Sequence, residues 1–349
     1  TYALLTLFGV ITVIFLLFNV FPGDPAQMML GQNEDTEQLA LVKQKYGFDK
    51  PISTQYLYYL IDLSQLSLHS NIKEDYTSLE SGKYSATKLF TLGNTTTVLK
   101  FPYLRESFTK QGKRVTEVLG ETLPNTFVLA VSAIIIAILL GVALGIVSAL
   151  FKDQWLDKTI QVLSTLGMSV PSFFSAILFA WLFGFVLHKY TNLEMTGSLY
   201  ELDDFGEAMH IKWKNLILPA IVLGIRPLAV VIQLMRNSLL EVFNQDYIRT
   251  ARAKGLSEFQ IIKKHAIKNA MNPVVTAISG WFASMLAGAV FVEYIFGWNG
   301  LGKEIVNSLN TLDLPVIMGS VLVIATMFVM INIFVDLIYA WLDPKVKLQ

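Results

Sequence analysis

The chain has 349 residues, no cysteine, and equal numbers of basic and acidic residues, so its formal net charge is zero. Hydrophobic residues make up 53% of it and charged residues 15%, and its mean hydropathy is +0.51. This composition is too apolar for an ordinary soluble domain, and without cysteine the chain can form neither disulfide bonds nor thiolate metal or redox sites. The composition therefore predicts an integral membrane protein.

Six stretches are apolar over about the 20 residues that a membrane-spanning helix needs. They predict an all-α membrane fold with spans at 3–20, 127–151, 160–187, 216–235, 274–295 and 316–341. The first stretch could instead be a secretory signal peptide, but it lacks a basic leader and no clear small-residue cleavage site follows it. We therefore expect a true span there. Because the chain begins at Thr1 rather than at methionine, we also expect that a short leader is missing.

The spans divide the chain into a first helix (1–20), an external segment (21–126) and a core with five spans (127–349). Cytoplasmic connections of membrane proteins carry an excess of Lys and Arg. If the amino terminus is cytoplasmic, the short cytoplasmic connections carry eleven such residues and the short external ones carry four. Both termini are therefore predicted to be cytoplasmic. The cytoplasmic set is Lys152, Lys158, Arg236, Arg249, Arg252, Lys254, Lys263, Lys264, Lys268, Lys345 and Lys347.

The external segment contains an amphipathic pattern followed by a polar stretch. An apolar face built from tyrosine and leucine predicts a helix that lies on the outer membrane surface or packs on the spans. Residues 71–106 are rich in Ser, Thr, Lys and Tyr, and Gly82 and Gly93 indicate turns there; the fold of this stretch stays open. The apolar face consists of Tyr56, Leu57, Tyr59, Leu60, Leu63 and Leu66.

Small residues recur every four positions in the second span, at Ala133, Ala137, Gly141, Gly145 and Ala149. Such a row lets another helix approach closely, so it predicts a central position for this span, although Ala and Gly are also frequent in spans generally. In the third span, glycine, proline and serine favour a kinked helix. Its polar side would suit a water-accessible path, or the kink could serve packing alone. The residues are Ser164, Gly167, Ser169, Pro171, Ser172 and Ser175.

Charges inside membrane spans are candidates for function. Arg226 lies in the middle of the fourth span, where it could neutralise an anionic group in a pathway or pair with another helix. Glu293 and Asp336 lie near span ends, where a structural role is favoured. Ser169, Arg226 and Trp281 are the candidates for lining a pathway.

The stretch from Tyr247 to Pro273 is basic, with Glu258 as its only acid. It predicts two short helices that meet at Gly255, a left-handed residue of the kind that ends helices. Ser257 and Gln260 have the spacing of a capping box at the start of the second helix. That helix should be amphipathic, with an apolar face formed by Leu256, Phe259, Ile262, Ala266 and Ala270.

The chain carries little that could support catalysis. Gly297 to Lys303 has the spacing of a phosphate-binding loop, but Glu304 stands where a hydroxyl should hold magnesium, and the predicted topology places the loop outside the cell. A turn and a short surface helix are the better interpretation. The four histidines lack ligand spacing for zinc, and no serine has the surroundings of a nucleophile. We therefore expect a chain that is no enzyme and holds neither metal nor cofactor.

Several motifs resemble one known family. Residues 247–256, YIRTARAKGL, together with 265–270, HAIKNA, and Pro273, resemble the cytoplasmic coupling loop of ABC importer permeases of the dipeptide and oligopeptide family. The stretch FPGDPA after the first span, with Pro22, Gly23, Asp24 and Pro25, resembles the hallmark of the B-type subunit in that family. Further similarity lies at 123–126, 169–173, 292–302 and 335–344.

Two departures from the family pattern stand out. Arg249, Thr250 and Ala251 occupy the positions that read Glu-Ala-Ala in ABC permeases generally, a variant typical of the peptide branch. Residues 71–106 resemble an insertion in the external segment.

The resemblance implies a type I importer permease in the bacterial inner membrane, forming half of a translocation pore. Its implied partners are a homologous C-type permease subunit, two cytoplasmic ATPase subunits that bind ATP and magnesium, an external substrate-binding protein and membrane lipid, but no nucleic acid. Alternatives are a permease for nickel, glutathione or sugar, an ion-coupled secondary transporter, or a loop that only clamps anionic lipid. Within the coupling loop, 236–273, the ATPase contacts would be Tyr247, Arg249, Ala251, Arg252, Gly255, Leu256 and Ser257.

Overall fold

The computed structural model describes residues 2–19, 26–27, 36–73, 75–202 and 208–342. These residues form two compact units, one made of Thr1–Glu121 with Ile305–Thr326 and the other of Thr122–Glu304 with Met327–Gln349. Helices α5 (Val115–Leu150), α14 (Leu301–Asn310) and α15 (Leu314–Leu342) contribute to both units. The family-like residues Pro22 to Pro25 lie outside the described part of the chain.

The first unit is built around a small apolar core between helices. Its first helices are α1 (Tyr2–Asn19), α3 (Thr36–Tyr46) and α4 (Ile52–Leu63). Tyr59 of α4 is buried with Phe15 of α1 and Met318 of α15, and the Tyr59 and Phe15 rings lie 5.7 Å apart. The predicted amphipathic helix therefore packs on apolar helices. It ends before Leu66, because Ser64 already has extended backbone angles.

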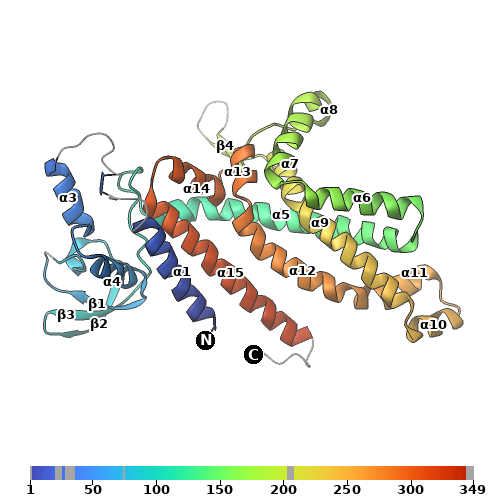
Figure 1. The fold of residues 1–349 in the computed structure, drawn as a ribbon, viewed down its shortest axis with the longest axis horizontal. Coiled ribbons are helices and arrows are strands. Elements are labelled where there is room, and N and C mark those ends of the chain that lie inside the picture. The colour runs from blue at the N-terminus through green and yellow to red at the C-terminus, as the bar shows by residue number, and fades with distance from the viewer. Residues whose placement is uncertain (1, 20–25, 28–35, 74, 203–207, 343–349) are drawn as a thin grey trace. The chain divides into compact units, whose positions relative to one another are not determined.

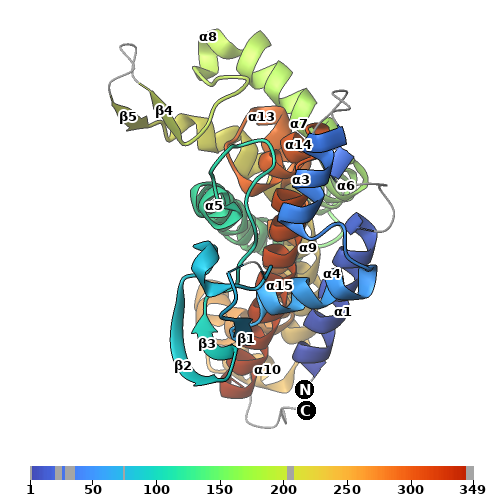
Figure 2. The ribbon, with the colours of Figure 1, turned by 90° about the vertical axis from the view of Figure 1, so that its left-hand side faces the viewer.

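The polar stretch after α4 contributes to an antiparallel sheet. Strands β1 (Leu66–Ser70), β2 (Ala86–Leu92) and β3 (Thr95–Lys100) lie in the order β1-β3-β2 (Figure 2), and a short 3-10 helix, η1 (Leu79–Ser81), precedes β2. Gly82 and Gly93 both have positive φ, at 71° and 59°, which confirms the two predicted turns. The described part of the chain is thus mostly helical, with a small antiparallel sheet after α4.

A buried carboxylate joins this sheet to α4. Asp62 is fully buried and accepts hydrogen bonds from the hydroxyls of Tyr76 (3.0 Å) and Tyr84 (2.8 Å). Arg105 Nε lies 3.4 Å from the same carboxylate, and Lys100 Nζ donates to the Asp62 backbone carbonyl at 2.6 Å. Every charge in the group has a partner, as buried polar networks require.

The second unit contains the helices from α6 to α13 and parts of α5, α14 and α15; Figure 1 labels these helices. It also contains two π-helical segments, η2 and η3, and a two-stranded antiparallel sheet. After α5 the elements are α6 (Trp155–Ser169), α7 (Ser172–Phe179), η2 (Ala180–Val186), α8 (His188–Thr191), β4 (Tyr200–Leu202), β5 (Met209–Ile211), α9 (Lys214–Phe243), α10 (Asp246–Ala253), α11 (Glu258–Ile261), η3 (Ile262–Ala266), α12 (Ile267–Gly288) and α13 (Val290–Phe296).

Length and composition identify three described helices that could span a membrane, in α5, α9 and α15. Two bent pairs would raise the number to five, and the apolar helix Ala3–Phe18 is shorter. Each predicted span thus falls on an apolar helix or a bent pair. The predicted kink in the third span is a full break, because Val170 and Pro171 are extended, and the segments on either side differ in direction by 108°.

The row of small residues on α5 is a helix-packing face. A Cβ on Gly141 would lie 2.6 Å from Val231 Cγ1 of α9, and one on Gly145 would lie 2.7 Å from Met235 Cβ. Both separations are too short for real contacts, so α9 can lie this close only against glycine. The structure therefore confirms close packing of another helix on this row.

Candidate functional site

The predicted coupling loop has the expected turn. Helices α10 and α11 are separated by Gly255, whose φ is +79°. The Ser257 hydroxyl accepts from the Gln260 backbone amide at 3.4 Å, and the Gln260 side chain accepts from the Ser257 amide at 3.2 Å. This is the predicted capping box. Arg252 and Glu258 form an ion pair across the turn at 2.9 Å.

One side of the loop is buried against its own membrane helices. Ile248 and Ala251 of α10 pack in a cluster with Ile261, Ala266 and residues of α9 such as Leu239. The cluster also contains Met235, Val242, Ala270 and Val274. Movement of the loop must therefore displace the helices that carry it.

The predicted apolar face is wrong at Phe259. That side chain is 71% exposed, whereas Ile261, which the spacing did not include, is fully buried. The reason is the π-helical turn η3, which changes the helical phase so that the buried face passes through Ile261, Ile262, Ala266 and Ala270.

The other side of the loop is exposed. Of the predicted ATPase contacts, Ala251 is buried and Leu256 is half-buried, while the others are exposed: Tyr247, Arg249, Arg252, Gly255 and Ser257. A side chain at Gly255 would not obstruct the turn by contact, because a Cβ there would meet nothing within 4 Å. Glycine is required by the backbone conformation instead, because a left-handed residue with a side chain is strained.

An ion pair that sequence reasoning missed lies close to this loop. The guanidinium of Arg236 on α9 donates to the Asp157 carboxylate of α6 through two bonds of 2.7 and 2.6 Å. The same carboxylate accepts from Ser148 of α5 and from the Asp153 amide. The Asp157 side chain is only 3% exposed and the Arg236 side chain 18%. This clamp joins α5, α6 and α9, and its members are 79 residues apart, so no local pattern reveals it.

Two of the three predicted pathway residues line one cavity. A cavity of about 500 Å³, including its mouth, lies beside the break between α6 and α7, and Arg226 of α9 and Trp281 of α12 line it. Ser169 is not among the lining residues; it is exposed, and its hydroxyl donates to the Thr165 carbonyl at 2.8 Å. Ser172 and Ser175, from the same serine-rich segment, take its place.

Residues 125–126 and 293–302, which carry two of the family-like motifs, contact one another. Trp298 is fully buried and its indole nitrogen donates to the Asn125 carbonyl at 3.0 Å, while the Leu301 amide donates to the Thr126 hydroxyl at 2.8 Å. The buried Glu293 carboxylate accepts from the Gly302 amide at 2.7 Å, in the first turn of α14. These contacts support a structural role for Glu293 and confirm the turn and short helix at Gly297 to Asn310. The Asp336 side chain lies outside the described residues.

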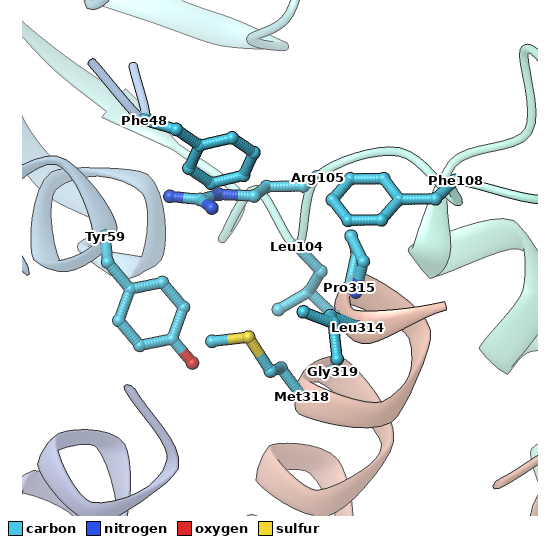
Figure 3. A pocket seen from close by; sticks show the side chains of 9 residues that line it. All are labelled: Phe48, Tyr59, Leu104, Arg105, Phe108, Leu314, Pro315, Met318 and Gly319. Atoms are coloured by element: carbon cyan, nitrogen blue, oxygen red, sulfur yellow. The ribbon is translucent and has the colours of Figure 1, made fainter. Parts of the chain in front are cut away.

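The first unit has a separate, apolar pocket of about 390 Å³ (Figure 3). Phe48, Tyr59 and Phe108 form part of its wall, and its only charged lining residue is Arg105, which is already paired with Asp62. Within the described part of the chain, no group of three or more His, Asp or Glu residues could hold a metal ion.

Comparisons with known proteins identify relatives over nearly the whole chain. Residues 141–348 match the family model of the binding-protein-dependent transport system inner membrane component, and residues 1–67 match the N-terminal model of such membrane components. The dipeptide transport system permease protein of Alkalihalophilus pseudofirmus is 33% identical, covering 98% of this chain and 95% of the relative. That of Bacillus subtilis is 32% identical, with 99% and 94% covered.

A third relative is named for a different substrate. The glutathione transport system permease protein of Salmonella choleraesuis is 31% identical, and the match covers 98% of this chain and 95% of the relative. The extent of these matches and the apolar helices described above agree. The chain belongs to the inner membrane components of binding-protein-dependent transport systems.

Proposed function

We propose that this chain is the B-type permease subunit of an ATP-driven importer of di- and oligopeptides, with both termini in the cytoplasm. A C-type permease subunit would complete the pore, two cytoplasmic subunits would bind ATP and magnesium, and an external protein would deliver the substrate. The relatives, which are dipeptide and glutathione transport system permease proteins, support a peptide or peptide-like substrate.

The observation that carries the coupling proposal is the two-sided loop. Its inner face, including Ile248 and Ile261, packs on α9. Its outer face presents Tyr247, Arg252 and Phe259 without cover. Exposed aromatic and arginine side chains are typical anchors of protein interfaces. A partner that pushed on the outer face would therefore move α9 and α12 as attached rigid bodies.

The same loop could instead only clamp anionic lipid through its lysines. Lys263, Lys264 and Lys268 are exposed and would serve that role. Loss of these charges would weaken lipid binding without affecting an ATPase contact made by the outer face of the loop. The two functions can therefore be separated by substitution.

A paired substitution tests the coupling surface. We expect Phe259→Asp to abolish copurification of the ATPase subunits and ATP-dependent uptake, because it replaces an exposed aromatic side chain of the outer face with a charge. Tyr190→Asp is the matched control, since Tyr190 is 83% exposed on the external helix α8. It should leave both measurements unchanged. Normal uptake by the Phe259→Asp variant, or its loss only when the three lysines are replaced, would contradict the proposed coupling.

A further inference from the structure

Arg226 has no counter-charge in the part of the second unit that the structure describes. It lies on α9 directly before Pro227, is exposed, and lines the cavity beside the α6–α7 break. None of the residues that line this cavity is acidic. Within the described residues the Arg226 guanidinium makes neither a hydrogen bond nor an ion pair.

This differs from two half-buried arginines of the chain. Arg105 is paired with Asp62, and Arg236 is paired with Asp157. A charge within a membrane span is expensive and normally faces a partner or a water-filled path. An arginine that instead faces a cavity is available to an anionic ligand.

The rest of the cavity wall suits a carboxylate attached to an organic group. The hydroxyls of Ser172, Ser175 and Ser284 can donate hydrogen bonds, and Trp281 gives one apolar wall. The planar guanidinium presents two parallel donors that match the two oxygens of a carboxylate.

We propose that this cavity, the Arg226 cavity, binds the carboxylate end of a peptide in transit. Arg226 forms the ion pair, the serine hydroxyls complete the hydrogen bonds, and Trp281 contacts the adjacent residue. The inference rests on the proposed function as a peptide permease. It adds to that function that the pathway recognises the carboxylate group of the substrate.

The test measures binding to the membrane complex without the external binding protein. The chain is purified with its permease partner and ATPase subunits, and alanylalanine or its C-terminal amide is titrated while tryptophan fluorescence is recorded. A Trp281→Phe variant identifies the signal from the cavity. We expect the free acid to bind about tenfold more tightly than the amide, the ratio that one charge-assisted hydrogen bond supports.

Substitutions on α9 assign the effect to one side chain. Arg226→Ala should remove the difference between acid and amide, and Arg226→Lys should keep part of it, because lysine retains the charge but not the fork. Gln233→Ala is the control, two helical turns further along the same face; its amide contacts Met168 Sδ at 3.6 Å. It should keep the wild-type ratio.

Three results would overturn the proposal. These are equal binding of acid and amide by the wild type, an unchanged ratio in Arg226→Ala, or failure of that variant to assemble with the permease partner, which would show that Arg226 pairs with an acid there. ATP-dependent uptake is assayed separately. A complex that imports substrate but does not distinguish acid from amide refutes only the carboxylate site, whereas absence of ATP-dependent uptake refutes the permease assignment itself.

Discussion

Removing Arg236 should destabilise the second unit strongly, because it leaves a carboxylate buried without its cation. Asp157 would retain only the Ser148 hydroxyl and the Asp153 amide as donors. Breaking a buried ion pair in this way costs about 3 to 5 kcal/mol. Since the Arg236 side chain is 18% exposed, we expect the lower value, about 3 kcal/mol.

The reverse substitution should cost less. In Asp157→Asn the Arg236 guanidinium can turn toward solvent through its exposed edge, so we expect about 1.5 kcal/mol, the value of one hydrogen bond to a charged group. The double variant should then cost about 2 kcal/mol less than the sum of the single variants, because the two side chains act as a unit.

Reversible denaturant unfolding of the purified chain in mixed micelles measures these free energies. The matched control is the exposed pair of Arg249 and Asp246, which lie 3.4 Å apart at 72% and 96% exposure. Its coupling should stay below about 0.5 kcal/mol. If the Asp157 and Arg236 effects add within about 0.5 kcal/mol, the clamp does not join these helices energetically, and the reasoning fails.

Three further predictions concern single positions. Gly145→Leu should lower the unfolding midpoint of the purified chain, at a cost of about 1 to 3 kcal/mol, because even its Cβ would overlap Met235; Gly280→Ala, where a Cβ meets nothing within 4 Å, should not. Gly255→Val should abolish ATP-dependent uptake while membrane insertion stays normal, whereas Gly255→Asn, which tolerates a left-handed backbone, should retain uptake; equal uptake by both would exclude the turn as a coupling element. Burial lowers the pKa of His69, so the folded sheet binds protons less readily than the unfolded chain. Its stability should be complete above the unfolded pKa of about 6.5 and fall as the pH drops below it. Proteolysis of residues 66–100 at pH 7.5 and 5.5 checks this, and the same pH dependence in His69→Asn would contradict it.

Local features of the loop were predictable from the sequence. The left-handed turn at Gly255 and the capping box at Ser257 depend on residues a few positions apart, and both are present. The small-residue row on α5 was also informative, since a glycine face specifies close packing whichever helix fills it. These signals need no knowledge of the rest of the fold.

Other features depend on contacts between distant residues. The sheet at 66–100 was not predicted, because its strands are short and β2 has no alternating buried face. The exposure of Phe259 depends on a π-helical turn that no spacing rule anticipates. The clamp between Asp157 and Arg236 joins two span ends whose proximity only the tertiary structure determines.

The π-helical turn η3 gives α12 a way to rotate. It lies between the capped start of α11 and the helix that carries Trp281, and a π turn holds one more residue than an α-helical turn in the same ladder. If a force on the turn at Gly255 shifted that extra residue along the helix, α12 would rotate about its own axis. A displacement of the loop would then become a rotation of α12, which would move Trp281 into or out of the Arg226 cavity with little change in helix length.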